Sequence, residues 1–373
     1  MIRLHMATSI WIALIAQSVP SSAQPINPDL AELLASWQAR QDRIDRIKYV
    51  AQGKAFIPKG QQYKLRASDG VSVAEHEAYP VEDYQYDVEL VLSLDFRSNC
   101  ARKETRGEVF VVSDLRYKEE TSICLYDGTH IQQYHPRDEN AMDPYDVELY
   151  ERTEDFSRFF FSTFDYPLFF GHAIFPRPGR RIDPKLGLLI PVLPSLYHVA
   201  GRAMQGDREC IVLQTEALSD TGSYHEYWVD IGWDAAVTHW ESVQGGHPRY
   251  VIAVAYEQTS HGFLPKHWSY AWYTGDGELR KKEEYDVRET VINPQFSEDL
   301  FRVKPKAGMT VFDVGAGREY IEGQPGSDLN ILRKQGAGRS LFPAAQIVLG
   351  VALACVTGVF LWYRRHRRRS LRQ

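Results

Sequence analysis

The feature that most constrains this chain lies near its C-terminus. From Leu341 to Tyr363, 23 consecutive residues carry no charged side chain, and a helix needs about 20 apolar residues to cross a bilayer. Trp362 and Tyr363 end this run, where interfacial aromatic residues belong. Six arginines follow within residues 364–373, as expected on the cytoplasmic side of a span. We therefore expect a transmembrane helix at 341–363 and a cytoplasmic basic tail at 364–373.

This end of the chain allows two other interpretations. A basic run can bind nucleic acid, but orientation of the span explains these arginines more simply, so no nucleic-acid partner is expected. An apolar run followed by arginines also resembles bacterial sorting signals that are cut and removed. The sequence just upstream, "RKQGAGRSLF", matches no such recognition motif well. A permanent anchor is the prediction.

The N-terminus resembles a secretory signal peptide. Arg3 precedes an apolar run at Ile10–Ala16, and the small residues Ser21 and Ala23 follow. This order of charged, apolar and small residues is typical of a cleaved leader, here residues 1–23, with an uncleaved anchor as the alternative. Together the two ends predict a single-pass protein of a bacterial cell membrane. Its main domain is expected on the periplasmic or extracellular side.

Composition adds limits to the kind of partner. The chain has 43 Lys and Arg against 49 Asp and Glu, and seven of the basic residues lie in the two end segments. The exported part is thus acidic, which disfavours a polyanionic ligand. Of four cysteines, Cys355 lies inside the span, and Cys100 with Cys124 is the most plausible disulfide pair, with buried free thiols as the equal alternative. Cysteine and histidine spacing suits no zinc site, so no metal or cofactor is expected.

The exported part begins with the marks of a helix. Asn27 is a favourable N-cap, Pro28 suits the first helical position and Asp29 complements the helix dipole. Apolar residues recur at helical spacing, at Leu30, Leu33, Leu34, Trp37, Ile44 and Ile47. We expect one amphipathic helix that packs its apolar face on the rest of the domain.

The remainder alternates in the manner of β-strands. One face of the run 87–96 is apolar, with Val88, Leu90, Leu92 and Leu94. Asp127 and Gly128 separate two strand-like runs, a strong hairpin signal. Because no long helices intervene between the strands, the pattern predicts an antiparallel sheet instead of βαβ units. A single mainly β domain is expected over residues 24–313.

The stretch "YHEYWVDIGWDAAVTHWES", residues 224–242, most resembles a catalytic site. Alternation nevertheless places His225 and Glu226 on opposite strand faces, so they cannot hold one substrate atom together. A meeting of His225 with His239 across a hairpin remains the alternative. We interpret the stretch as two half-buried strands. The chain also lacks the motifs of serine hydrolases, zinc proteases and nucleotide-binding enzymes, so an enzyme is not expected.

One segment departs from the β pattern. Residues 156–179 carry eight phenylalanines, and prolines interrupt residues 186–199 that follow. Such apolar density is either a plug that covers the open end of a curved sheet or a lid over an apolar pocket. The two interpretations are compatible, because a plug that moves is a lid. The ligand-contacting candidates are Phe160, Phe161, Phe164, Phe169, Phe170 and Leu189.

The order of these elements is similar to that of LolA-like proteins, which include periplasmic lipoprotein carriers and outer-membrane lipoprotein-sorting proteins. The resemblance lies in "LLASWQARQDRI", "LYDGTHIQQYHP", "HEYWVDIGWDAAVTHWES", "HGFLPKHWSYAW" and "VINPQFSEDLFRVKPKAGMTVFD", and it covers Asp29–Asp313. It implies an unclosed antiparallel β-barrel wrapped around helices, with an apolar concave face that holds acyl chains. It supplies no catalytic residues.

This chain departs from the carriers in two respects. It carries a predicted anchor, whereas a carrier is a soluble shuttle, and residues 314–340 are extra sequence whose glycine content predicts a spacer beside the membrane. The function hypothesis is a tethered domain that binds a lipid or a lipoprotein acyl chain. The alternative is an interaction or envelope-sensing module with a protein partner and no small-molecule ligand.

Overall fold

The computed structural model describes residues 27–62, 82–111, 116–134, 147–150, 162–174, 196–215, 222–314 and 316–324. Within these residues, fifteen strands form one sheet. The sheet order is β15-β14-β6-β5-β4-β3-β2-β1-β13-β12-β11-β10-β9-β8-β7. Every pairing is antiparallel except that of β14 with β6. Strands β15 and β7 are the two ends of the order, so the described sheet is unclosed and the predicted mainly β architecture is confirmed.

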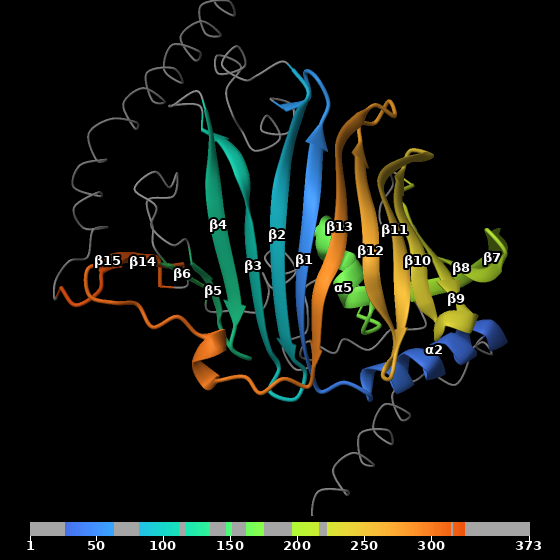
Figure 1. Ribbon diagram of the computed structural model, residues 1–373, viewed down its shortest axis with the longest axis horizontal. Coiled ribbons are helices and arrows are strands. Elements are labelled where there is room, and N and C mark those ends of the chain that lie inside the picture. Colours follow the sequence, from blue (N-terminus) through green and yellow to red (C-terminus); the bar gives the residue numbers. More distant parts are fainter. Residues whose placement is uncertain are drawn as a thin grey trace, which may run out of the picture.

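The strands are short at the ends of the sheet and long at its centre (Figure 1). Their bounds are β1 Arg46–Ile57, β2 Tyr84–Asp95, β3 Cys100–Val111, β4 Arg116–Tyr126, β5 Ile131–Tyr134, β6 Val147–Tyr150, β7 Tyr197–Gln205, β8 Arg208–Thr215, β9 Tyr224–Asp230, β10 Ala236–Gln244, β11 His247–Thr259, β12 Gly262–Tyr273, β13 Leu279–Ile292, β14 Thr310–Asp313 and β15 Arg318–Ile321.

The first helix, α2 (Pro28–Gln41), begins as predicted. The Asn27 side chain accepts a hydrogen bond from the Asp29 backbone N–H, and the buried face contains Leu30, Leu33 and Trp37. The expected continuation of the helix to Ile47 is wrong. Gln41 ends the helix, and Ile47 instead lies on β1, paired with both β2 and β13. Apolar spacing alone could not separate a helix end from the first inward residues of the next strand.

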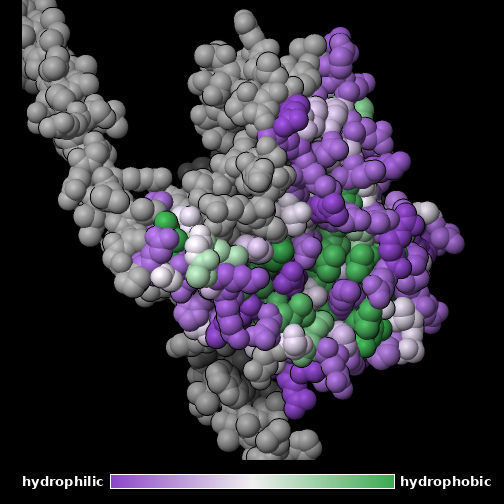
Figure 2. Space-filling model, turned by 60° about the vertical axis from the view of Figure 1, so that its left-hand side comes forward, coloured by the Kyte–Doolittle hydropathy of each residue, from purple (hydrophilic) through white to green (hydrophobic). Residues whose placement is uncertain are grey.

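The central strands carry the core on one face. Val88, Leu90, Leu92 and Leu94 are all buried, as the alternation on β2 predicts. Gly53 on β1 lies opposite Tyr285 on β13. A Cβ atom at Gly53 would stand 2.4 Å from the Tyr285 ring, so glycine is what lets that buried ring lie over β1. Figure 2 shows a face where hydrophilic side chains predominate around a smaller apolar area.

The stretch 224–242 forms β9 and β10, joined through the 3-10 turn η6 (Ile231–Trp233). A register shift between Val237 and His239 places His239 opposite Trp228, on the face away from His225. The two histidines therefore do not meet. Each lies beside a different tryptophan instead: His225 stacks on Trp240 and His239 packs on Trp228. The interpretation of this stretch as half-buried strands is confirmed.

Of the two alternatives for Cys100 and Cys124, a disulfide or free thiols, the structure shows free thiols. Cys124 pairs with Lys103, three residues beyond Cys100 on β3. Because strand side chains alternate, an odd offset of three puts the two sulfur atoms on opposite faces of the sheet. The third described cysteine, Cys210, is also free.

The folded sheet also extends beyond residue 313. Strand β15 pairs with β14, although residues 314–340 were predicted to be a spacer, so a spacer can begin only after Ile321. Among the described residues, no helix has the length and apolarity that a membrane crossing requires. The predicted signal peptide at 1–23, the predicted span at 341–363 and the basic tail lie outside the described residues.

Candidate functional site

A short helical segment fills one face of the curved sheet. This plug segment, residues 162–174, contains the 3-10 turn η4 (Thr163–Asp165) and the helix α5 (Tyr166–Phe170). Figure 1 shows α5 behind β13 and β12, enclosed by the curve of the sheet. Pro167 suits the first turn of a helix, and every residue from Asp165 to Ile174 is buried. The plug segment is thus part of the domain interior.

A buried ion pair joins the plug segment to β3. The Lys103 ammonium lies 2.9 Å from Oδ2 of Asp165 and donates a second hydrogen bond of 3.1 Å to the Ser162 hydroxyl. The two charged side chains are 7% and 0% exposed. Burial raises the pKa of Asp165 to about 6, against the opposing effect of Lys103, and the nearby Glu283 raises it further. The other carboxylate oxygen, Oδ1, has no hydrogen-bond partner among the residues that the structure describes.

Three further hydrogen bonds fasten the plug segment to distant parts of the chain. The indole N–H of Trp268 on β12 donates to the Phe164 carbonyl at 2.7 Å. The Tyr49 hydroxyl on β1 lies 2.9 Å from Nε2 of His172. Burial lowers the pKa of His172 to about 3, so its ring is neutral at physiological pH. At the end of α2, the Gln41 amide donates to the Ala173 carbonyl at 3.1 Å.

Aromatic rings line the face that the plug segment covers. Tyr166 meets Trp240 on β10 edge to face, with 5.2 Å between the ring centroids. Phe170 meets Tyr227 on β9 in the same manner at 6.1 Å. Trp268 stacks on Tyr285 at 4.8 Å. Edge-to-face and offset stacked pairs at such distances are favourable beyond the burial of their area. Buried polar groups also lie among these rings: Glu283 accepts from the Tyr285 hydroxyl and pairs with Lys281 at 2.6 Å, and His225 stacks on Trp240.

The structure describes three of the six predicted ligand-contacting residues and places all three in the plug segment. Phe169 and Phe170 are each 1% exposed and belong to the hydrophobic core. Phe164 is partly buried, and its ring lies parallel to that of Tyr285 at 6.1 Å. The remaining three lie outside the described residues: Phe160, Phe161 and Leu189. The phenylalanines thus fill the concave face in this arrangement, and their role as ligand contacts stays a prediction.

Sequence reasoning missed the polar residues that hold the plug segment. A lysine on the same strand face as the buried Ala101 was a usable signal for Lys103, because that face points inward. Nothing in the sequence links it to Asp165, which lies 62 residues later. The partnership of Tyr49 with His172 likewise joins positions 123 residues apart.

The polar side chains that hold the plug segment are paired with one another. The buried histidine is neutral and faces a tyrosine, and the buried carboxyl faces an ammonium group. Neither arrangement contains a nucleophile with a base and a group that orients it. Within the described part of the chain, no group of three or more His, Cys, Asp or Glu side chains is arranged to hold a metal ion.

Comparison with known proteins finds similarity to solved structures alone. No protein-family model and no curated protein matches the sequence. The chain is similar to a domain described as that of an outer-membrane lipoprotein-sorting protein from Vibrio parahaemolyticus, with 12% identity, a TM-score of 0.39, and coverage of 73% of this chain and 97% of that one. A DUF1329 family protein from Desulfovibrio piger has 11% identity, a TM-score of 0.37, and coverage of 75% and 98%.

A third similar structure is the MucA/MucB complex of Pseudomonas aeruginosa, with 12% identity, a TM-score of 0.23, and coverage of 74% of this chain and 61% of that one. TM-scores of this size do not by themselves establish a common fold. The structure itself shows an unclosed and predominantly antiparallel sheet curved around a short helical segment.

Proposed function

We propose that this domain binds an acyl chain of a lipid or a lipoprotein on the concave face of its sheet, where the plug segment lies in the present arrangement. In this proposal the plug segment is a lid, and the acyl chain takes the place of its phenylalanines. The predicted signal peptide and C-terminal span would hold the domain on the outer side of the cell membrane, within reach of such ligands.

One observation carries the proposal. The plug segment is buried along its helix, yet its described polar links to the rest of the domain are few and specific, and the surface under it is lined with aromatic rings. Lifting such a segment exposes an aromatic surface that is interrupted by the buried Lys103 and Glu283. An acyl chain is the ligand that recovers the burial, at about 0.8 kcal/mol for each CH₂ group.

The test is photo-crosslinking of the full chain, purified from membranes, with a palmitate analogue that carries a diazirine at its chain end. Adducts are expected on residues that face the plug segment, such as Tyr49, Tyr227 and Trp268, and unlabelled palmitate should compete for them. Adducts confined to the predicted span would contradict the proposal, because the probe labels that segment whenever it partitions non-specifically around an apolar anchor.

A reversible lock separates a lid from a permanent plug. A Cβ atom at Gly171 would lie 2.7 Å from Cδ of Pro265, so these two positions are neighbours and Gly171→Cys with Pro265→Cys is the pair to test for a disulfide. Oxidation should abolish labelling of the concave face, and a reductant should restore it. The wild type under the same oxidation is the control. Equal labelling in both redox states would show that the plug segment does not move.

The second candidate function is a protein-interaction or sensing module. The observation that favours it is the end strand β7, which has only β8 as a neighbour among the described strands and which presents Met204 at 60% exposure. An unpaired strand edge can accept an added strand from another chain. Crosslinking in intact cells that joins β7 to an envelope protein, together with no acyl adduct, would favour this function over the first.

A further inference from the structure

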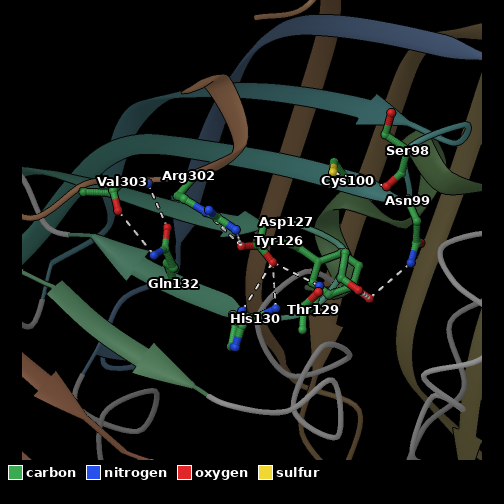
Figure 3. A network of polar contacts seen from close by, with 11 residues as sticks. Ser98, Asn99, Cys100, Tyr126, Asp127, Thr129, His130, Gln132, Arg302 and Val303 are labelled. Carbon is green, nitrogen blue, oxygen red and sulfur yellow. Dashed lines mark hydrogen bonds and ion pairs between the residues drawn. The ribbon is translucent and has the colours of Figure 1, made fainter. Parts of the chain in front are cut away.

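Two segments that lie far apart in the sequence meet at the lower end of the sheet. Arg302 follows the 3-10 turn η7 (Glu298–Phe301) and donates two hydrogen bonds to Oδ2 of Asp127, from Nη2 at 2.6 Å and from Nε at 3.0 Å. Beside it, Gln132 accepts from the Val303 N–H at 2.7 Å (Figure 3). These contacts fasten the segment 296–304 across the turn between β4 and β5.

The fastened segment forms one wall of a cleft. This end cleft has a volume of about 600 Å³. Its other wall comes from the ends of the central strands, with Arg46 at the start of β1, Asp95 at the end of β2 and Cys100 at the start of β3. A volume of this size is within the range of small-molecule sites. It lies outside the concave face that the plug segment fills.

The two buried carboxylates of the end cleft are already satisfied. Asp95 accepts from Nε of Arg46 and from the Ser98 N–H, both at 2.8 Å. Asp127 accepts from the N–H groups of Thr129 and His130 besides the two bonds from Arg302. Their side chains are 5% and 9% exposed. The two carboxylates thus accept hydrogen bonds from backbone N–H and guanidinium groups and hold two turns in place. These carboxylates have little capacity left to bind a ligand.

The cationic side chains of the end cleft can still donate hydrogen bonds to a ligand. In the described part of the chain, Arg46 bonds to Asp95 through Nε, which leaves its two Nη groups for a ligand. Arg302 uses Nε and Nη2 and is 55% exposed, so Nη1 remains. Lys304 pairs with Asp299 at the rim, where both side chains are about three-quarters exposed. An exposed pair of this kind is weak and exchanges readily with another anion.

An apolar wall stands beside these donors. Phe296 and Phe301 meet edge to face with 5.3 Å between their ring centroids, and both line the end cleft. Two guanidinium groups and an ammonium group together can bind a compact anion that has several acceptor oxygens. Arginine is especially suited to bind such an anion. The aromatic wall suits an apolar group attached to that anion.

We propose that the end cleft is a binding site for a phosphate group, bound by Arg46, Arg302 and Lys304. The same chemistry is offered by a soluble phosphate ester and by the headgroup of a phospholipid at the membrane surface. This site is independent of the concave face, so its presence or absence leaves the proposed acyl-binding function undecided.

The test uses the full chain, purified from membranes in a neutral detergent, and two probes. The soluble arm titrates inorganic phosphate and glycerol 3-phosphate and follows binding by calorimetry and by ³¹P line broadening. The membrane arm measures binding of the same protein, reconstituted in nanodiscs, to vesicles of phosphatidylcholine with and without phosphatidylglycerol. Binding in the soluble arm identifies a free phosphate ester. Binding in the membrane arm alone identifies a headgroup.

Matched variants make the test specific. Lys304→Gln removes one exposed positive charge. Arg46→Lys keeps the positive charge but removes the planar guanidinium group. Each should weaken binding about tenfold, the loss of one charge-assisted hydrogen bond. Lys266→Gln on β12 is the control, because that lysine also belongs to a surface ion pair, with Glu257, and lies outside the end cleft. The proposal is overturned if neither probe binds at millimolar concentration, or if Lys266→Gln weakens binding as much as Lys304→Gln.

Discussion

The Lys103 ammonium and the Asp165 carboxylate are 2.9 Å apart and nearly inaccessible to solvent, and they join the plug segment to the centre of the sheet. A buried ion pair of this kind is costly to desolvate, so it is weak evidence for stability in itself. What it does supply is position, because a lone buried charge on either partner would be strongly unfavourable. The pair therefore specifies where the plug segment lies.

The first prediction concerns pH. Because burial raises the pKa of Asp165 from 3.8 to about 6, folding favours its protonated form. Its contribution to the free energy of unfolding is fully present below about pH 4 and is lost as pH rises through about 6, a change of roughly 3 kcal/mol. Asp165→Asn cannot titrate and lacks this component. Urea unfolding from pH 4 to pH 7 should therefore show the wild type losing stability relative to the variant. A constant difference would contradict the prediction.

The second prediction is a double-mutant cycle on the same pair. Lys103→Met or Asp165→Leu alone leaves an unpaired buried charge and should destabilise the domain by about 3–5 kcal/mol, whereas the double variant should recover most of that loss. Chemical denaturation measures all four proteins. The exposed pair of Lys282 with Glu284, at 2.6 Å, is the control and should show little coupling. Additive losses at Lys103 and Asp165 would show that the pair is not coupled.

The third prediction concerns close packing at the centre of the sheet. Gly53→Ala places a methyl group 2.4 Å from the Tyr285 ring and 2.7 Å from the Glu284 carbonyl oxygen, so it should destabilise the domain by about 1–3 kcal/mol. Gly107→Ala is the matched control, because its nearest neighbour would lie at 3.7 Å, an ordinary contact. Thermal unfolding should separate the two variants. Equal melting temperatures would refute the role assigned to Gly53.

The fourth prediction concerns acid. Burial lowers the pKa of His225 to about 4 from 6.5, so its contribution to stability is present above about pH 6.5 and is lost as pH falls through about 4, roughly 3 kcal/mol in all. His225→Phe keeps an aromatic ring against Trp240 and removes the titration. The variant should therefore resist acid unfolding better than the wild type, measured by near-UV circular dichroism. If both proteins unfold over the same acidic pH range, the result would argue against this effect.

Much of the fold was predictable because its signals are local. Asn27 caps the first helix through a neighbouring N–H, and Asp127 accepts from the N–H groups of Thr129 and His130 in the predicted hairpin turn. The apolar face of β2 follows from alternation alone. The concave site was predictable only as an apolar segment near a sheet. Its phenylalanines indicate burial, but the sequence does not show which residues they contact.

Local pattern could not choose between alternatives where one residue of register decided the outcome. Without the shift between Val237 and His239, continued antiparallel pairing would place His239 opposite Tyr227, on the face of His225. The shift instead turns Trp240 into the core and His239 away from it. A β-bulge has no reliable sequence signature, because it reflects packing between strands that meet only in the folded chain.

The sequence by itself determined the mainly β class, the hairpin at Asp127-Gly128 and the start of the first helix, because these depend on interactions among near neighbours. Only the tertiary structure decided that Lys103 meets Asp165, that Asp127 meets Arg302 and that Cys100 and Cys124 lie on opposite faces. Each of these relationships depends on strand register or on long-range pairing. Register is a property of the assembled sheet, and a shift of one residue reverses which side chains meet.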